Sequence, residues 1–229
     1  MYKNKKIVAI IPARGGSKGI KNKNIRIINN KPLVAYSIES ALKCKYIDYT
    51  LVSTDSKEIA EISKSYGAQV PFLRPKEIAT DSSKTIDVLI HAMNFLANSG
   101  NYFDYVMLLQ PTQPIRAEEE LEKTIEIVVD RRLPSLVSIC EVEETPILMR
   151  TIDTNKKLKR VLNINSTVRR QDFPKFYKVN GSIYINKIED LNLNTSLNDN
   201  EYGYIMPKNH SVDIDTEDDL KLAEKILKG

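Results

Sequence analysis

Apolar and polar positions alternate in two rhythms along the first 140 residues. Short apolar runs, typical of buried strands, occupy residues 7–11, 49–53, 105–109 and 135–140. Stretches with apolar residues at helical spacing separate these runs, at residues 33–44, 56–67, 85–98 and 117–129. Buried strands that alternate with amphipathic helices indicate a mostly parallel sheet covered on both faces. The pattern therefore predicts an α/β fold.

The rhythm changes after Cys140. Shorter strand candidates follow at residues 147–152, 158–161, 181–185 and 202–206. One more helical pattern ends the chain, at residues 216–227. The segment from about 141 to 178 breaks the alternation, so we expect it to be an insertion that forms an arm or a dimer contact. The Asn-rich segment at 191–200 is typical of a surface loop.

Composition limits the class of protein without naming it. A chain of 229 residues, 41% hydrophobic and 28% charged, can bury the core of one domain spanning 1–229. A net charge of +4 is no argument for nucleic-acid binding. The apolar run at 7–12 is too short for a signal peptide or a membrane span. Cys44 and Cys140 show no paired spacing and are expected to be buried thiols, so we expect a cytoplasmic protein.

A basic, glycine-containing loop follows the first predicted strand. Residues 12–24 hold three glycines and four cations, Arg14, Lys18, Lys21 and Lys23. Glycines let backbone amides approach an anion, and ligands of open α/β sheets bind at the carboxyl ends of strands. The spacing matches neither the P-loop nor the dinucleotide-binding motif. The loop predicts a polyphosphate site of another kind, although these residues alone also allow a solvated basic turn.

Two carboxylates near the C-terminus, Asp213 and Asp215, are two positions apart. In an extended segment both side chains would point to one face, and two oxygen ligands suit Mg²⁺ that also binds phosphate. Helix capping is an alternative for Asp215, because a helical pattern follows it, but capping leaves Asp213 unexplained. Asp55 is a third candidate, with a capping role for the helix near Ser56 at least as plausible.

Further motifs occur in a fixed order along the chain, at residues 11–19, 23–24, 31–33, 52–55, 73–75, 109–116, 170–174, 180–185 and 213–216. Their order and spacing resemble those of the CMP-sialic acid synthetases, also called acylneuraminate cytidylyltransferases, over essentially the whole chain. The resemblance implies a Rossmann-like nucleotidyltransferase fold and a homodimer whose arm is the 141–178 insertion. It also implies Mg²⁺-dependent transfer of CMP from CTP to the anomeric hydroxyl of N-acetylneuraminic acid or a related nonulosonic acid.

The resemblance assigns roles to individual residues. It implies that CTP is bound by Ala13, Arg14, Ser17, Lys18, Asn24, Arg74 and Thr85. It implies catalytic roles for Arg14, Lys23, Asp213 and Asp215, and a sugar-acid site with Gln110, Arg170, Lys178 and Asn180. Asp213 and Asp215 would be the metal ligands, which favours chemistry over capping.

The sequence departs from the family pattern at two places. Lys178 stands where some members carry an arginine, which removes bidentate carboxylate recognition. Gln113 and Ile115 replace the usual residues of the motif at 110–116. The rival functions are therefore a CMP-legionaminic or CMP-pseudaminic acid synthetase and, from another class, a non-catalytic nucleotide- or nucleic-acid-binding module. The basic loop lacks the interleaved aromatics of an RNA-binding surface, so no nucleic-acid partner is expected. We expect His91 and His210 to have structural roles.

Overall fold

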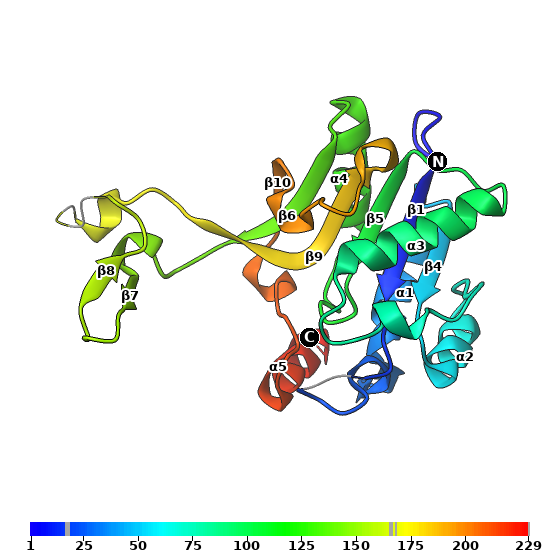
Figure 1. Ribbon diagram of the computed structural model, residues 1–229, viewed down its shortest axis with the longest axis horizontal. Coiled ribbons are helices and arrows are strands. Elements are labelled where there is room, and N and C mark those ends of the chain that lie inside the picture. The colour runs from blue at the N-terminus through cyan, green and yellow to red at the C-terminus, as the bar shows by residue number, and fades with distance from the viewer. Residues whose placement is uncertain (17–18, 165–166, 168, 229) are drawn as a thin grey trace.

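A six-stranded sheet forms the centre of the computed structural model, which describes residues 1–229 except 17, 18, 165, 166, 168 and 229 (Figure 1). The strand order is β10-β6-β9-β5-β1-β4. The strands are β1 (Ile7–Pro12), β4 (Tyr49–Ser53), β5 (Tyr105–Leu109), β6 (Ser135–Glu141), β9 (Tyr177–Lys187) and β10 (Tyr202–Ile205). β9 is antiparallel to both of its neighbours, and all the other pairs are parallel.

Helices cover both faces of this sheet because its strands alternate apolar side chains between the faces. In β1, Ile7, Ala9 and Ile11 belong to the core that includes residues of α1, α2 and α4, whereas Val8 and Ile10 pack with α3. The helices are α1 (Leu33–Lys43), α2 (Lys57–Ser65), α3 (Thr85–Asn98), α4 (Glu118–Asp130) and α5 (Glu217–Lys228). The predicted α/β fold with a mostly parallel sheet is confirmed.

Two element predictions were wrong in detail. β9 begins at Tyr177, whereas the sequence predicted a start at 181. The first residues of the strand are exposed and lack the apolar run by which a buried strand is recognised, so the pattern contained no signal for them. Residues 147–149 are not in a strand: Pro146–Leu148 form a 3₁₀ helix, which a proline at its start favours. Only β7 (Arg150–Ile152) and β8 (Leu158–Arg160) remain as a small antiparallel pair.

The basic loop leads into two small elements, a 3₁₀ turn and a β-hairpin. A 3₁₀ turn at Lys23–Ile25 follows it, and β2 (Ile27–Ile28) pairs with β3 (Lys31–Pro32) as a hairpin. The hairpin turn consists of Asn29 and Asn30 at φ 45° and 65°. Asparagine tolerates this left-handed conformation, so the sequence suits the turn.

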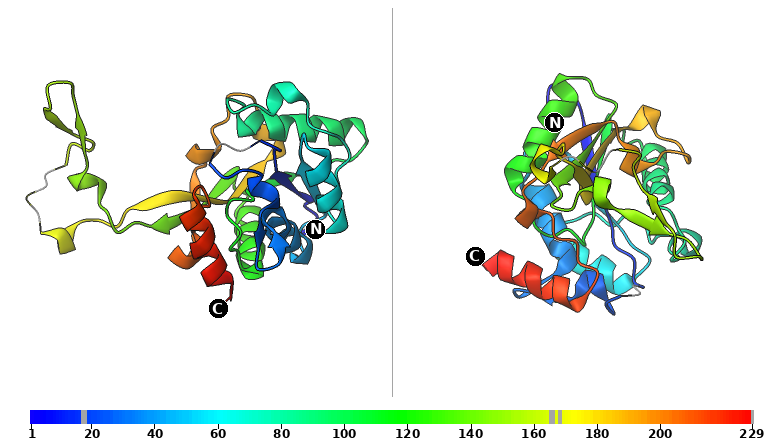
Figure 2. Two further views of the ribbon diagram at one scale, coloured as in Figure 1. Left: turned by 90° about the horizontal axis from the view of Figure 1, so that it is seen from below. Right: turned by 90° about the vertical axis from the view of Figure 1, so that its left-hand side faces the viewer.

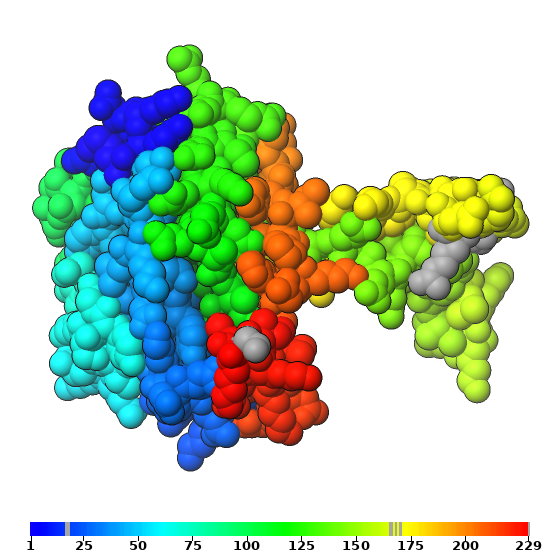
Figure 3. Space-filling view, turned by 180° about the vertical axis from the view of Figure 1, so that it is seen from behind, coloured from blue at the N-terminus to red at the C-terminus, as the bar shows by residue number. Residues whose placement is uncertain are grey.

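An arm leaves the body of the molecule at the ends of β6 and β9. These strands stay paired out to Glu141 and Tyr177, and the segment between them, with β7 and β8, lies away from the sheet (Figures 1 and 2). The space-filling view shows the arm standing off the body (Figure 3). The arm exposes large apolar side chains, among them Ile152 and Leu158, which are 64% and 63% exposed. The insertion predicted at 141–178 is thus an extended arm.

Two further sequence expectations can be compared with the described residues. Cys44 and Cys140 are both buried and free. None of the helices that the structure describes has the length and apolar character required to cross a bilayer.

Candidate active site

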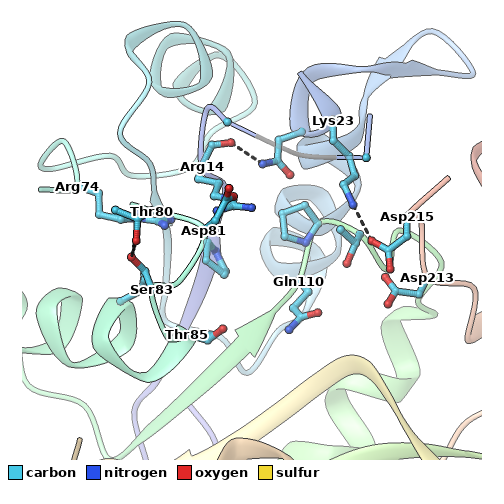
Figure 4. A pocket seen from close by; sticks show the side chains of 17 residues that line it. Arg14, Lys23, Arg74, Thr80, Asp81, Ser83, Thr85, Gln110, Asp213 and Asp215 are labelled. Carbon is cyan, nitrogen blue, oxygen red and sulfur yellow. Dashed lines mark hydrogen bonds and ion pairs between the residues drawn. The ribbon is translucent and has the colours of Figure 1, made fainter. Parts of the chain in front are cut away.

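A pocket of about 460 Å³ opens at the carboxyl ends of β1 and β5 (Figure 4). Its residues come from the basic loop, the segment before α3, the segment after β5 and the acidic segment before α5. They include Arg14, Gly16, Gly19, Lys23, Asn24, Arg74, Thr80, Asp81, Ser83, Thr85, Gln110, Thr112, Asp213 and Asp215. The predicted basic loop and acidic pair, about 190 residues apart in the chain, therefore line one pocket.

The start of the basic loop is held by backbone hydrogen bonds. The amide of Ala13 donates to the carbonyl of Ser53 at 2.9 Å, and that of Gly15 donates to Asp55 Oδ1 at 2.8 Å. The capping role for Asp55 is wrong, because the cap of α2 is the Ser56 hydroxyl, which accepts from the amide of Ile59. Asp55 is not among the residues that line the pocket. Asp55 instead fixes the backbone from which Arg14 projects.

The middle of the loop packs directly against the acidic segment. A Cβ added to Gly19 would lie 2.5 Å from the carbonyl oxygen of Asp215, closer than any side chain can approach. Ile20, which follows Gly19, and Ile214, which precedes Asp215, are both buried in one apolar cluster. Gly19 therefore permits a close approach between the cations of the loop and the carboxylates of the acidic segment.

The acidic pair has the geometry expected of an extended segment. Ile214 is fully buried and its amide donates to the carbonyl of Thr112 at 2.9 Å, while Asp213 and Asp215 on either side of it line the pocket. Lys23 Nζ donates to Asp215 Oδ1 and to the carbonyl of Ile214, both at 2.8 Å. The Lys23 side chain is only 12% exposed, so its ammonium is fixed beside the carboxylate.

Helix capping does not explain Asp215. α5 is capped by Thr216 and Asp219: the Thr216 amide donates to Asp219 Oδ2 at 2.8 Å, and the Asp219 amide donates to the Thr216 hydroxyl at 3.3 Å. This reciprocal pair is a capping box. The carboxylate of Asp215 is left facing the pocket and Lys23.

The two carboxylates fit a magnesium ion that completes its shell with phosphate and water. Partial enclosure raises the pKa of Asp213, and the Asp215 charge raises it further, against a hydrogen bond from Thr112 and the charge of Lys23. Such mutual repulsion is relieved by a divalent cation. Among the described residues, no group of three or more His, Cys, Asp or Glu could hold a metal without help. Mg²⁺ needs no such cage when it is shared with a nucleotide.

Two arginines line the other side of the pocket. Arg14 Nη1 forms an ion pair with Asp81 Oδ1 at 2.7 Å, and the Asn24 amide donates to the Arg14 carbonyl at 2.9 Å. Arg74 is 6% exposed and donates to the hydroxyl and the carbonyl of Ser53. Burial lowers the pKa of Arg74 to about 10, with Asp55 opposing and Arg14 adding to the shift, so it stays charged at pH 7.

A second pocket of about 480 Å³ adjoins the first and shares Thr85 and Gln110 with it. Its lining mixes apolar with amide and hydroxyl side chains: Lys84, Ile86, Leu108, Tyr184, Leu193, Asn194, Thr195, Ser196, Leu197 and Asn198. The Tyr184 hydroxyl donates to Asn198 Oδ1 at 3.0 Å. Burial, together with the charge of Asp213, raises the pKa of Tyr184 to about 12. In Figure 4, Gln110 lies between the side of the pocket that holds Arg14 and the side that holds Asp213.

Other predicted residues lie elsewhere or outside the description. Ser17 and Lys18 are outside the described residues. Ala13 is fully buried and does not line the first pocket, and Lys178 lines a separate cavity at the base of the arm. Arg170 belongs to a 3₁₀ turn (Arg170–Asp172) of the arm.

Asn180 is 5% exposed and lies in neither pocket. Its Oδ1 accepts from the Ser138 hydroxyl at 2.5 Å, and its amide nitrogen donates to the Ser211 hydroxyl at 2.8 Å. This arrangement shapes the bulge between β6 and β9.

Several residues of the site were not predicted from the sequence. Thr80, Asp81 and Ser83 line the first pocket, and the Thr80 and Ser83 hydroxyls are 2.8 Å apart. Their signal was a cluster of small polar residues directly before a helix, which also describes an ordinary loop. The histidines are outside both pockets: His91 packs edge-on against Phe72, and His210 Nδ1 is 3.0 Å from Glu120 Oε1.

A mostly parallel α/β sheet with a basic loop after its first strand and a carboxylate pair in the same pocket defines a nucleotidyltransferase of the Rossmann-like class. The chain belongs to the cytidylyltransferase family, whose model matches residues 8–228.

Relatives by sequence and by structure cover almost the whole of this chain. The chain is 37% identical over 227 residues to the CMP-N,N'-diacetyllegionaminic acid synthase of Legionella pneumophila, covering 97% of this chain and 96% of that one. It is 35% identical over 222 residues to the N-acylneuraminate cytidylyltransferase of Escherichia coli O18:K1:H7, covering 95% of this chain and 51% of the relative. The solved structure of CMP:2-keto-3-deoxy-manno-octonic acid synthetase complexed with CTP shares the fold, with a TM-score of 0.73 and 19% identity over 97% and 98% of the two chains.

Proposed function

We propose that the protein transfers CMP from CTP to the anomeric hydroxyl of an N-acylated nonulosonic acid and releases pyrophosphate. The observation that carries the proposal is the pair of adjoining pockets, one bordered by fixed cations and carboxylates and the other by mixed apolar and amide groups, with Gln110 in both. A transfer reaction needs two such sites, because the nucleotide and the acceptor must meet at the reacting phosphorus.

CTP would occupy the first pocket. Arg14 and the loop amides around Gly16 would bind the phosphates, Asn24 the ribose, and Arg74 and Thr85 the nucleoside end. Arg14 can offer phosphate the donors that its ion pair with Asp81 leaves unused, since a guanidinium carries five N–H groups.

Mg²⁺ would be held by Asp213 and Asp215 and would supply neutralising charge to the phosphates. Lys23 stands beside these carboxylates, so its ammonium would face the α-phosphate where negative charge develops. The acceptor oxygen forms a bond to the α-phosphorus, the bond to the β-phosphate oxygen breaks, and pyrophosphate leaves with its electron pair. The hydroxyl proton passes to water.

The acceptor would occupy the second pocket. Ile86, Leu193 and Leu197 offer surface for the methyl groups of N-acyl substituents, while Asn194 and Ser196 offer hydrogen bonds to amides and hydroxyls. The relative with 37% identity is named for an acid with two acetyl groups. We therefore place diacetyllegionaminic acid first among the acceptors to test, with N-acetylneuraminic and pseudaminic acids as alternatives.

The active form would be a homodimer joined through the arm. The arm extends away from the body of its own chain and exposes apolar side chains, so it is suited to contact a second copy (Figure 3). Arg170 belongs to this arm, so its predicted role in the sugar-acid site would depend on the dimer. Light scattering of the wild type and of Ile152→Ser with Leu158→Ser tests this: the wild type should have twice the mass of the monomer and the double variant should not.

Pyrophosphate release from CTP and Mg²⁺ with each acid in turn tests the reaction. Release with one or more of these acids, and formation of the matching CMP-sugar, supports the proposal. Release with none of them, together with tight binding of an oligonucleotide, would favour the non-catalytic binding module. Asp213→Asn with Asp215→Asn is the matched control, and its full Mg²⁺-dependent activity would contradict the metal assignment.

A further inference from the structure

Arg116 lies outside both pockets, in the segment between β5 and α4, and its side chain points back toward them. Its guanidinium donates to the carbonyl of Gln110 at 2.5 Å, to the carbonyl of Ser182 at 3.0 Å and to the hydroxyl of Ser37 at 2.9 Å. The three acceptors belong to the segment after β5, to β9 and to α1. One planar cation therefore joins three elements where they meet Gln110.

The charge of Arg116 is enclosed and compensated. Enclosure lowers the pKa of Arg116 to about 9, and the carboxylate of Glu120 opposes this shift, so the guanidinium stays protonated at pH 7. Glu120 is itself 7% exposed; it accepts from the amide of Ala117 at 2.8 Å and lies 3.0 Å from His210 Nδ1. Removing a cation from water without such partners is strongly unfavourable, so the arrangement needs an explanation beyond packing.

The side chain of Gln110 is confined as well as its backbone. Gly181 has φ +77°, and a Cβ added there would lie 3.2 Å from Gln110 Oε1. The Gln110 amide thus rests against the backbone of β9 one residue before Ser182, whose carbonyl Arg116 binds. Gln110 is fixed from both ends, and it borders both pockets.

We infer that Arg116 is a positioning residue for the transfer: it holds Gln110, and through it the junction of the two pockets, in the geometry that aligns the acceptor hydroxyl with the α-phosphorus. This inference rests on the proposed function. Arg116 lines neither pocket; its effect would pass through the Gln110 backbone to the position of the Gln110 side chain. Misalignment of about 1 Å at such a junction lowers turnover by about 10²-fold.

Steady-state kinetics of Arg116→Met and Arg116→Lys, with calorimetric CTP binding, test the inference. Arg116→Met should lower kcat/KM for the sugar acid by about 10²-fold. CTP affinity should change less than about two-fold, because the CTP contacts lie elsewhere in the first pocket. Arg116→Lys keeps the charge beside Glu120 but cannot reach three acceptors, so it should be intermediate. If either variant lost CTP affinity by as large a factor as it lost kcat/KM for the sugar acid, the inference would be overturned.

A double-mutant cycle with Gln110→Ala separates positioning from general destabilisation. If Arg116 acts through Gln110, Arg116→Lys should have little further effect on kcat/KM in the Gln110→Ala background. Additive losses would contradict this. Arg131→Met is the matched control, because Arg131 stacks over the Tyr202 ring at 5.2 Å, away from both pockets, and it should behave as wild type.

Two measurements keep the outcomes distinct. A wild type that turns over no sugar acid contradicts the proposed function, whereas an active wild type with unaffected Arg116 variants contradicts the positioning role. Peptide-level hydrogen exchange reads the positioning role without turnover: Arg116→Lys should raise exchange in residues 110–114, and Arg131→Met should not. Unchanged exchange there would also overturn the inference.

Discussion

Lys23 Nζ lies 2.8 Å from Asp215 Oδ1, so the basic loop and the acidic segment meet in an ion pair at the pocket wall. Asp215 is 72% exposed and Lys23 only 12%, so the ammonium is held from behind while the carboxylate stays accessible. This asymmetry allows Asp215 to bind a cation without displacing Lys23. Because the pair is partly exposed, we expect it to contribute little to the free energy of unfolding and more to activity.

Lys23→Met should abolish most of the activity and little of the stability. Loss of one fixed charge at the reacting phosphate is expected to lower kcat by about 10² to 10³. The ion pair is half exposed, so its loss should lower the free energy of unfolding by at most about 1 kcal/mol. Pyrophosphate release and a urea titration measure the two effects. A variant with near-normal kcat would show that Lys23 does not act at the phosphate.

Gly19→Ala should disturb the site through the backbone. The added methyl would lie 2.5 Å from the Asp215 carbonyl oxygen, so the loop and the acidic segment must separate. Because the cations and carboxylates then lose their alignment, we expect kcat to fall by about 10²-fold and the melting temperature to fall as well. Gly16→Ala is the control for stability, since a methyl there meets nothing within 4 Å. Equal melting temperatures for the two variants would contradict the predicted clash.

Asp81→Asn should strengthen CTP binding. The Asp81 carboxylate pairs with Arg14 at 2.7 Å, and it would face the phosphates once CTP binds. Removing its charge releases Arg14 and reduces repulsion, and a pair this exposed is worth up to about 1 kcal/mol, or about five-fold in Kd. Calorimetric titration with CTP measures the change. Weaker binding would instead mean that Asp81 orients Arg14 for phosphate.

Asp219→Ala should lower stability through the cap of α5. Hydrogen bonds from Thr216 lower the pKa of Asp219, so its carboxylate favours the folded state above its ordinary pKa, and this contribution is lost as pH falls through the lowered value. Loss of the capping box should reduce the free energy of unfolding by about 1 kcal/mol at pH 7. Urea titrations at pH 7 and pH 2 check this: the difference between variant and wild type should shrink in acid.

Much of the fold followed from the sequence because the strands and helices carry strong apolar periods. β1, β5 and α3 lie within a residue of their predicted bounds, since the two strands are buried along their length and the helix along one face. β9 was placed too short because its outer end pairs only with β6 in the arm, where no core marks it. Burial sets the apolar pattern, so an exposed strand gives little signal.

The candidate site was predictable where chemistry and spacing coincide. Asp213 and Asp215 could be placed on one face from their spacing, and Ile214 between them is buried as that requires. The roles of Asp55 and Gly19 could not be predicted, because each depends on backbone groups that only the tertiary structure brings near. Asp81 was missed for the same reason: its partner, Arg14, is 67 residues away in the chain.

β9 connects the arm to the wall of the second pocket. The same strand begins in the arm at Tyr177 and reaches the second pocket at Tyr184, a span of roughly 23 Å at about 3.3 Å per residue. Because the strand lies between β5 and β6, hydrogen-bonded backbone connects the arm to the wall of that pocket. Substitutions in the arm can therefore change acceptor kinetics without touching a ligand.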